Sequence, residues 1–305
     1  MKSIFSKAQL STQQGGRPPA AVELSSEGVL AAALPSAGQT AVYAFVPLPG
    51  GALAPGIGEP NIRATETVVN AIKSALAQAS PRSRAVTLVV PDTVVRVFVL
   101  DFDSLPAKPV EALPVLRFRL RKMVPFDVEH AGLSYQVLSQ SRTECRVLAA
   151  VLPAPILAEY EAVVRAAGFE PGAVLPSSLA ALEAIDSMEA ILAANLSGVA
   201  LTTSIANGQD LLLYRTLDLP ADEALRLREV QRGIAVAAAY YEDKLGVKAR
   251  KLHYAGVQEG GEFARWIDDP DLTVVDLAAR PETGAVTSLG NASIAGVAGA
   301  LAGVR

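Results

Sequence analysis

Short apolar runs, separated by polar or glycine-containing turns, form the first ordered part of the chain. They occupy residues 20–24, 28–36 and 41–49. The connections are short and polar or glycine-containing, which predicts an antiparallel meander of three strands. The same pattern returns at residues 191–197, 199–208 and 209–219. We therefore expect two units that begin in the same way.

Apolar positions at helical spacing follow each predicted meander. Val68, Val69, Ile72 and Leu76 share one face of a helix expected at 64–79. Further helices are expected at 114–126, 154–168, 177–185, 221–246, 261–269 and 292–303. The helix at 221–246 is expected to be either continuous or broken near Gly233. Further strands are expected at 85–91, 94–102, 132–140, 144–153, 248–256 and 272–279.

The order of three strands, a helix, a strand and a helix occurs twice, so the fold class is α/β. This duplicated βββαβα pattern resembles the actin-like (ribonuclease H-like) fold that sugar kinases, heat-shock ATPases and bacterial filament proteins share. We expect a disordered tail at 1–19, a first domain at 20–186 and a second domain at 187–305. The first domain is expected to carry an inserted α+β subdomain at about 104–171.

Charge and composition exclude several functional classes. The formal net charge is −4, which gives no general electrostatic reason to bind nucleic acid. The single cysteine, Cys145, excludes an internal disulfide framework and fits a reducing compartment. With only His130 and His253 beside it, a zinc site is not expected. We find no apolar stretch long enough to span a membrane and no secretory signal, and so expect a cytoplasmic chain.

The middle of the chain resembles the PilM family of type IV pilus assembly proteins. The matching elements are a Pro-Asp turn, a Leu-Pro element, a Pro-Phe pair that closes a helix, and a strand, in that order. They are Pro91-Asp92, Leu105-Pro106, Pro125-Phe126 and Tyr135-Gln136-Val137. The resemblance extends from about residue 20 to residue 302, and it rests on the order of these elements rather than on any single motif.

This resemblance implies an actin-like scaffold at the cytoplasmic face of the inner membrane. Such a protein binds the N-terminal cytoplasmic tail of the membrane protein PilN and links the periplasmic PilN–PilO scaffold to the pilus motor. A non-enzymatic adaptor is therefore our leading hypothesis. The alternatives are an active ATPase or small-molecule kinase of the same fold, and the cytoplasmic module of a type II secretion platform.

The nucleotide-binding elements of the fold depart from their usual pattern. Actin-like ATPases carry an Asp-x-Gly element in each of two hairpins, where glycine lets backbone N–H groups approach phosphates and aspartate acts through the metal. The candidate nucleotide residues here are Glu23, Ser25, Ser26, Asn195, Ser197, Gly198 and Gly256. Glu23 and Asn195 replace aspartates, and Ser25 replaces a glycine. We expect negligible hydrolysis and no catalytic residues, and leave weak binding of ATP with Mg²⁺ open.

The candidate partner site lies in the inserted segment. Arg117, Arg119, Arg121 and Lys122 alternate with apolar residues in the predicted helix, which by itself is typical of a solvated helix face. The resemblance favours a groove for an extended peptide instead, with contributions from Arg117, Arg119 and Phe126. We interpret Asp92 as a turn residue after Pro91. His253 is interpreted as structural and Cys145 as an inert thiol.

Overall fold

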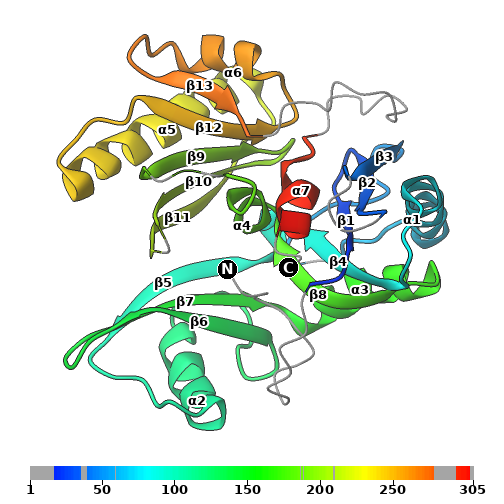
Figure 1. Ribbon diagram of the computed structural model, residues 1–305, viewed down its shortest axis with the longest axis horizontal. Helices are drawn as coiled ribbons and strands as arrows, with labels where there is room; N and C mark the ends of the chain where they lie inside the picture. Colours follow the sequence, from blue (N-terminus) through cyan, green and yellow to red (C-terminus); the bar gives the residue numbers. More distant parts are fainter. Residues whose placement is uncertain are drawn as a thin grey trace.

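The computed structural model describes residues 17–35, 40–58, 60–185, 187, 189–208, 210–277 and 293–302. Two five-stranded sheets lie on either side of a central region, and a smaller sheet lies below them in Figure 1. Residues 1–16 of the expected tail fall outside the described part. Arg17, by contrast, is buried and forms an ion pair with Glu183, so the ordered chain begins before residue 20.

The first large sheet has the strand order β3-β2-β1-β4-β8. Its elements are β1 (Ala20–Leu24), β2 (Gly28–Ala33), β3 (Val42–Pro47), α1 (Thr65–Ala79), β4 (Ala85–Val90), α3 (Ala154–Ala166), β8 (Glu170–Pro176) and α4 (Ser177–Leu182). The first three strands form the predicted antiparallel meander, and β4 then pairs parallel to β1. Helix α1 buries its apolar face, including Val68, Ile72 and Leu76, as its spacing predicts.

The second large sheet repeats this order as β11-β10-β9-β12-β13. Its elements are β9 (Ile191–Leu196), β10 (Ala200–Asn207), β11 (Asp210–Asp218), α5 (Glu223–Leu245), β12 (Lys251–Gly256), α6 (Gly260–Ile267) and β13 (Thr273–Asp276). The duplicated 3-2-1-4-5 topology is that of the actin-like fold, as predicted. Helix α5 runs unbroken through Gly233, where an added Cβ would lie 2.8 Å from Cδ2 of Leu201.

The inserted subdomain has different limits from those we predicted. It contains β5 (Arg96–Phe102), α2 (Pro109–Leu120), β6 (Gly132–Gln140) and β7 (Cys145–Leu152), with a short 3₁₀ turn at Asp92–Val94 leading into it. Strand β5 pairs with β7, so the insertion starts near residue 96 and not at 104. It ends near residue 152 and not at 171, because α3 and β8 belong to the first large sheet and its covering layer.

Two predicted elements also differ in detail. The expected helix at 114–126 is instead α2 at Pro109–Leu120, because Pro109 occupies its first turn, where proline is well tolerated. Strand β8 was not predicted, because Pro171, Gly172 and Pro176 interrupt its apolar pattern. It lies at the edge of its sheet, where proline removes no ladder hydrogen bond.

The last helix, α7 (Ala295–Ala302), packs on the first half of the molecule although it follows the second half in the chain. Ile294, Val297, Ala300 and Leu301 join the hydrophobic core of the first half. The expected second domain at 187–305 therefore differs from the structure at its end, because its final helix packs in the core of the first half (Figure 1). No helix in the described part of the chain combines the length and apolarity of a bilayer-spanning segment.

Candidate functional site

Two matching hairpins face the space between the large sheets. In the first, which joins β1 to β2, the Ser25 hydroxyl accepts a hydrogen bond from the Gly28 amide at 3.2 Å. In the second, which joins β9 to β10, the Ser197 hydroxyl accepts one from the Ala200 amide at 3.0 Å. Ser25 occupies the position where we expected a phosphate-approaching glycine, and in the second hairpin that glycine is either replaced by Ser197 or shifted to Gly198. The two serine hydroxyls therefore each engage one backbone amide of their own turn.

The tips of the two hairpins touch. An added Cβ at Gly198 would lie only 2.6 Å from Oε1 of Glu27, so the Glu27 carboxylate lies directly against the second hairpin. The Ser26 hydroxyl donates to the same Oε1 at 2.9 Å. Ser26 and Gly198 thus meet around a carboxylate of the chain itself. This carboxylate places negative charge between the hairpins, where a phosphate would also bring negative charge.

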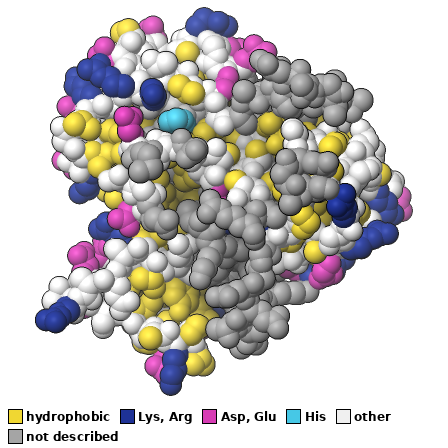
Figure 2. All heavy atoms as spheres, in the orientation of Figure 1, with side chains coloured by type: hydrophobic (Ala, Val, Ile, Leu, Met, Phe, Trp, Pro, Cys, Tyr) yellow, Lys and Arg dark blue, Asp and Glu magenta, His cyan; other side chains and the backbone are white. Residues whose placement is uncertain are grey.

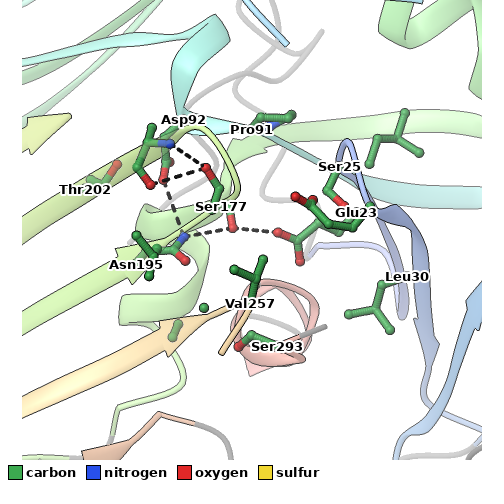
Figure 3. Close-up of a pocket in the computed structure, with 18 of the residues that line it drawn as sticks. Glu23, Ser25, Leu30, Pro91, Asp92, Ser177, Asn195, Thr202, Val257 and Ser293 are labelled. Carbon is green, nitrogen blue, oxygen red and sulfur yellow. Dashed lines mark hydrogen bonds between the residues drawn. The ribbon is translucent and has the colours of Figure 1, made fainter. Parts of the chain in front are cut away.

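A chain of polar side chains lies beneath the hairpins (Figure 3). Ser177 donates to Oε1 of Glu23 at 2.6 Å, and the Asn195 amide donates to Oγ of Ser177 at 3.1 Å. The same amide lies 3.4 Å from Oδ2 of Asp92. Tyr214 of β11 donates to Oδ1 of Asp92 at 2.8 Å. The network therefore joins both halves of the molecule through hydrogen bonds.

Asp92 and Ser177 are site residues that the sequence analysis missed, and the interpretation of Asp92 as only a turn residue is wrong. Asp92 does begin a short turn, but its carboxylate is buried and accepts from the Ser178 amide at 3.0 Å and from the Ser178 hydroxyl. One signal was available. Asp92 and Ser177 directly follow β4 and β8, and the carboxyl ends of parallel strands share the edge at which α/β proteins bind ligands.

Two of these carboxyl groups hold protons more tightly than usual. Burial raises the pKa of Glu23 to about 7, against a lowering effect of the Ser177 hydrogen bond, and the nearby Asp92 and Glu27 raise it further. Burial also raises the pKa of Asp92, although its hydrogen bonds from Ser178 and Tyr214 act in the opposite direction. Oε2 of Glu23 is buried without a hydrogen-bond partner among the described residues. It faces Gly296 of α7, where an added Cβ would lie 2.4 Å away.

The hairpins and the polar network line a cavity of about 440 Å³. Five of the seven predicted nucleotide residues line it, namely Glu23, Ser25, Asn195, Ser197 and Gly256, whereas Ser26 and Gly198 lie beside it at the hairpin tips. Leu24, Leu30, Phe45, Leu196 and Val257 supply apolar walls. The charged side chains among the described lining residues are Glu23, Glu27 and Asp92, with no Lys, Arg or His.

Gly256 has a packing reason to be glycine. A Cβ there would lie 2.3 Å from the hydroxyl oxygen of Tyr254, whose ring stacks on Phe263 at a centroid distance of 4.0 Å. The core of the second half therefore requires a glycine at this candidate nucleotide residue. Its identity alone is no sign of a nucleotide.

These residues do not fit a nucleoside triphosphate with Mg²⁺. A triphosphate needs cations or outward-facing amides around it, whereas the described lining offers three carboxyl groups and no cation, and one amide of each hairpin, that of Gly28 or Ala200, already donates to a serine of its own turn. Within the described residues, no group of three or more His, Cys, Asp or Glu side chains is arranged to hold a metal ion.

The three predicted partner residues lie in the inserted subdomain, in different environments. Arg117 donates to the backbone carbonyls of Val128 and, at 3.1 Å, of Ala131, and so holds the loop that follows α2. Phe126 packs against the core of the small sheet. Arg119 is exposed on α2. Of the three, Arg117 and Phe126 are thus engaged within the subdomain, and Arg119 is exposed.

Comparisons with known proteins agree with this fold. No protein-family model and no curated protein matches the chain. A solved structure described as a PilM–PilN type IV pilus biogenesis complex is similar over 95% of this chain and 98% of that chain, with a TM-score of 0.72 at 16% identity. The cytoplasmic domain of EpsL, an inner-membrane component of the type II secretion system of Vibrio cholerae, is similar over 87% and 90%, with a TM-score of 0.51 at 15% identity. At such identities the likeness shows the actin-like fold.

Proposed function

We propose that this protein is a cytoplasmic adaptor in the inner-membrane platform of a type IV pilus or a type II secretion machine. In this role it holds the N-terminal tail of a PilN-like membrane protein and is thereby peripheral to the inner membrane. It does not turn over nucleotide. The observation that carries the proposal is the likeness to the PilM–PilN complex, which extends over nearly the whole of both chains.

The shape of the inserted subdomain supports a peptide site there. Strand β6 is the last strand of the small sheet, and no other strand in the described part of the chain pairs with its outer edge. An extended peptide can add to such an edge as a further strand. Because Arg117 and Phe126 are engaged within the subdomain, we place the tail along β6 rather than on those side chains.

The cleft supports the non-enzymatic part of the proposal. Phosphoryl transfer requires a held metal and donors aimed at the γ-phosphate. Instead, the carboxylate of Glu27 lies between the hairpins. The hydroxyls of Ser25 and Ser197 each accept a hydrogen bond from a backbone amide of their own turn. In place of a nucleotide, the bonds of Asp92 to Tyr214 and Asn195 connect the two halves.

Calorimetric titration with a synthetic N-terminal tail of the PilN-like partner, combined with hydrogen exchange, tests the proposal. We expect saturable binding and slower amide exchange in residues 132–140, because edge pairing protects strand amides. A scrambled tail of the same composition is the control. Exchange in β3, an edge strand of the first large sheet, serves as the internal reference and is expected to stay unchanged.

The two parts of this test have separate consequences. Absence of binding by the wild-type protein contradicts the adaptor function itself. Binding with protection outside residues 132–140 keeps the adaptor function and contradicts the placement along β6.

A further inference from the structure

Helix α2 carries apolar side chains on two opposite faces. Its inner face places Ala112, Leu116 and Leu120 in the core of the small sheet. On its outer face, Val110 is 75% exposed and Phe118 is 72% exposed. Pro114 and Val115 lie between them and are also exposed. Val110, Pro114 and Phe118 are four residues apart, so they form one stripe about 12 Å long.

Cations surround this outer stripe. Residues 108–123 contain five Lys and Arg side chains and one acid, Glu111, which pairs with Lys108 at 3.7 Å. Arg121 pairs with Glu129, and Arg117 is engaged with loop carbonyls. Arg119 and Lys122 form no ion pair within the described residues. Arg119 directly follows Phe118 in the chain, and Lys122 lies about one helical turn beyond it.

The distribution of charge along the chain indicates which part of the molecule would face an anionic surface. The inserted subdomain, residues 96–152, has eight basic and six acidic side chains, although the chain as a whole has a net charge of −4. An anionic surface therefore attracts this subdomain and repels the rest of the molecule. In Figure 1, α2 lies on the outer side of the small sheet, away from both large sheets. Figure 2 shows hydrophobic side chains gathered on the same lower lobe.

We propose that the outer face of α2 (Val110, Pro114, Val115 and Phe118), with Arg119 and Lys122, docks directly onto an anionic lipid bilayer. The apolar tips enter the boundary between headgroups and acyl chains, and the two unpaired cations meet lipid phosphates. This combination of a protruding apolar stripe and flanking cations suits a flat interface. The proposal rests on these residues and not on the proposed adaptor function.

Co-sedimentation with vesicles tests the proposal. We expect the wild-type protein to bind vesicles of phosphatidylglycerol and phosphatidylethanolamine, and to bind phosphatidylcholine vesicles far less. Arg119→Gln and Lys122→Gln should each weaken binding about fivefold, because each Lys or Arg near an anionic surface raises the binding affinity by about that factor. Raising the salt concentration should weaken binding as well, because it screens the charges. Phe118→Ser should reduce binding through lost insertion.

Matched controls separate docking from nonspecific attraction. Val247 is 58% exposed on the other half of the molecule, so Val247→Ser should leave binding unchanged while Val110→Ser weakens it. Because the chain has one tryptophan, Trp266, the double variant Phe118→Trp, Trp266→Phe places a single fluorescent reporter on α2. A blue shift of its emission on adding anionic vesicles supports insertion.

Three results overturn the proposal. The first is no binding to anionic vesicles by the wild type. The second is wild-type binding by all three of Phe118→Ser, Arg119→Gln and Lys122→Gln. The third is no emission shift from the reporter. A shift caused by the PilN-like tail in the absence of lipid would assign the face to a protein partner instead. Thermal melting checks that each variant folds, which exposed positions should permit.

Discussion

The two hairpins of the cleft occupy equivalent places in the repeated halves, and they share one chemical change. In each, a serine hydroxyl accepts from a backbone amide of its own turn, Gly28 in the first hairpin and Ala200 in the second. They differ at the tip. The first hairpin presents the carboxylate of Glu27, and the second presents Gly198, which has no side chain.

This difference shows how two equivalent hairpins can meet across a cleft. The side chain of one hairpin fits against the bare backbone of the other, while the network from Asp92 to Tyr214 joins the halves below. Because Gly198 has no side chain, the Glu27 carboxylate can approach the backbone of the second hairpin.

The largest effect should separate two glycines of the hairpins, Gly28 at the start of β2 and Gly198 at the tip of the second hairpin. Gly28→Ala should lower the free energy of unfolding by roughly 3 kcal/mol, because the new Cβ would lie 2.4 Å from Cζ of Phe45 and 2.6 Å from the Val46 carbonyl oxygen. Gly198→Ala should cost less than about 1 kcal/mol, because the flexible Glu27 side chain can move away. Urea denaturation of both variants measures this. Equal losses would contradict the account of the tips.

A second effect depends on pH. Because the folded-state pKa of Glu23 is about 7 and its ordinary value is 4.5, the folded protein binds this proton more tightly. The stability that the protonated carboxyl provides is complete below about pH 4.5 and is lost as pH rises through about 7. Glu23→Gln, which keeps an acceptor for Ser177, should therefore stabilise the protein by roughly 2 kcal/mol at pH 8.

Denaturation of wild type and Glu23→Gln at pH 5 and pH 8 measures this difference. The advantage of the variant should be much smaller at pH 5, where the wild-type carboxyl is protonated in the folded protein. Glu66→Gln, an exposed change in the first turn of α1, is the control and should show no comparable pH dependence. An advantage that is the same at both pH values would mean that Glu23 is not the titrating group.

The shared serines should give smaller and similar effects. Ser25→Ala and Ser197→Ala each remove one acceptor for a turn amide, so each should lower stability by about 1 kcal/mol. Thermal or urea unfolding of the two single variants provides the comparison. A loss in only one of them would show that the serines do not have the same role in both halves.

The smallest expected signal is nucleotide turnover. Phosphate release from ATP with Mg²⁺ should not exceed that of a blank without protein, because the cleft lacks the donors and the held metal that the reaction needs. The assay should be run beside Asn195→Ala. Steady Mg²⁺-dependent release by the wild type that this variant abolishes would favour the active ATPase over the adaptor.

Much of the fold could be predicted from local sequence patterns. Alternating apolar and polar positions with short turns predicted both meanders, and helical spacing predicted α1 and α5, because these elements depend on neighbours in the chain. The limits of the insertion were wrong because they depend on distant pairing. Whether residues 96–102 join the large or the small sheet is decided by β7, some fifty residues later in the chain.

The candidate site was predicted in part for the same reason. Glu23, Ser25, Asn195 and Ser197 lie in hairpins with a recognisable spacing, and the structure places them around the cavity. Asp92 and Ser177 follow strands that no local motif connects. They meet the hairpins only because four strands end at one place in the fold.

The most direct test of the central claim is one titration performed twice, with the PilN-like tail added to the protein in the absence and in the presence of Mg²⁺-ATP. An adaptor that does not use nucleotide should bind the tail with the same affinity in both cases. Absence of binding, or binding that appears only when Mg²⁺-ATP is present, would contradict this account.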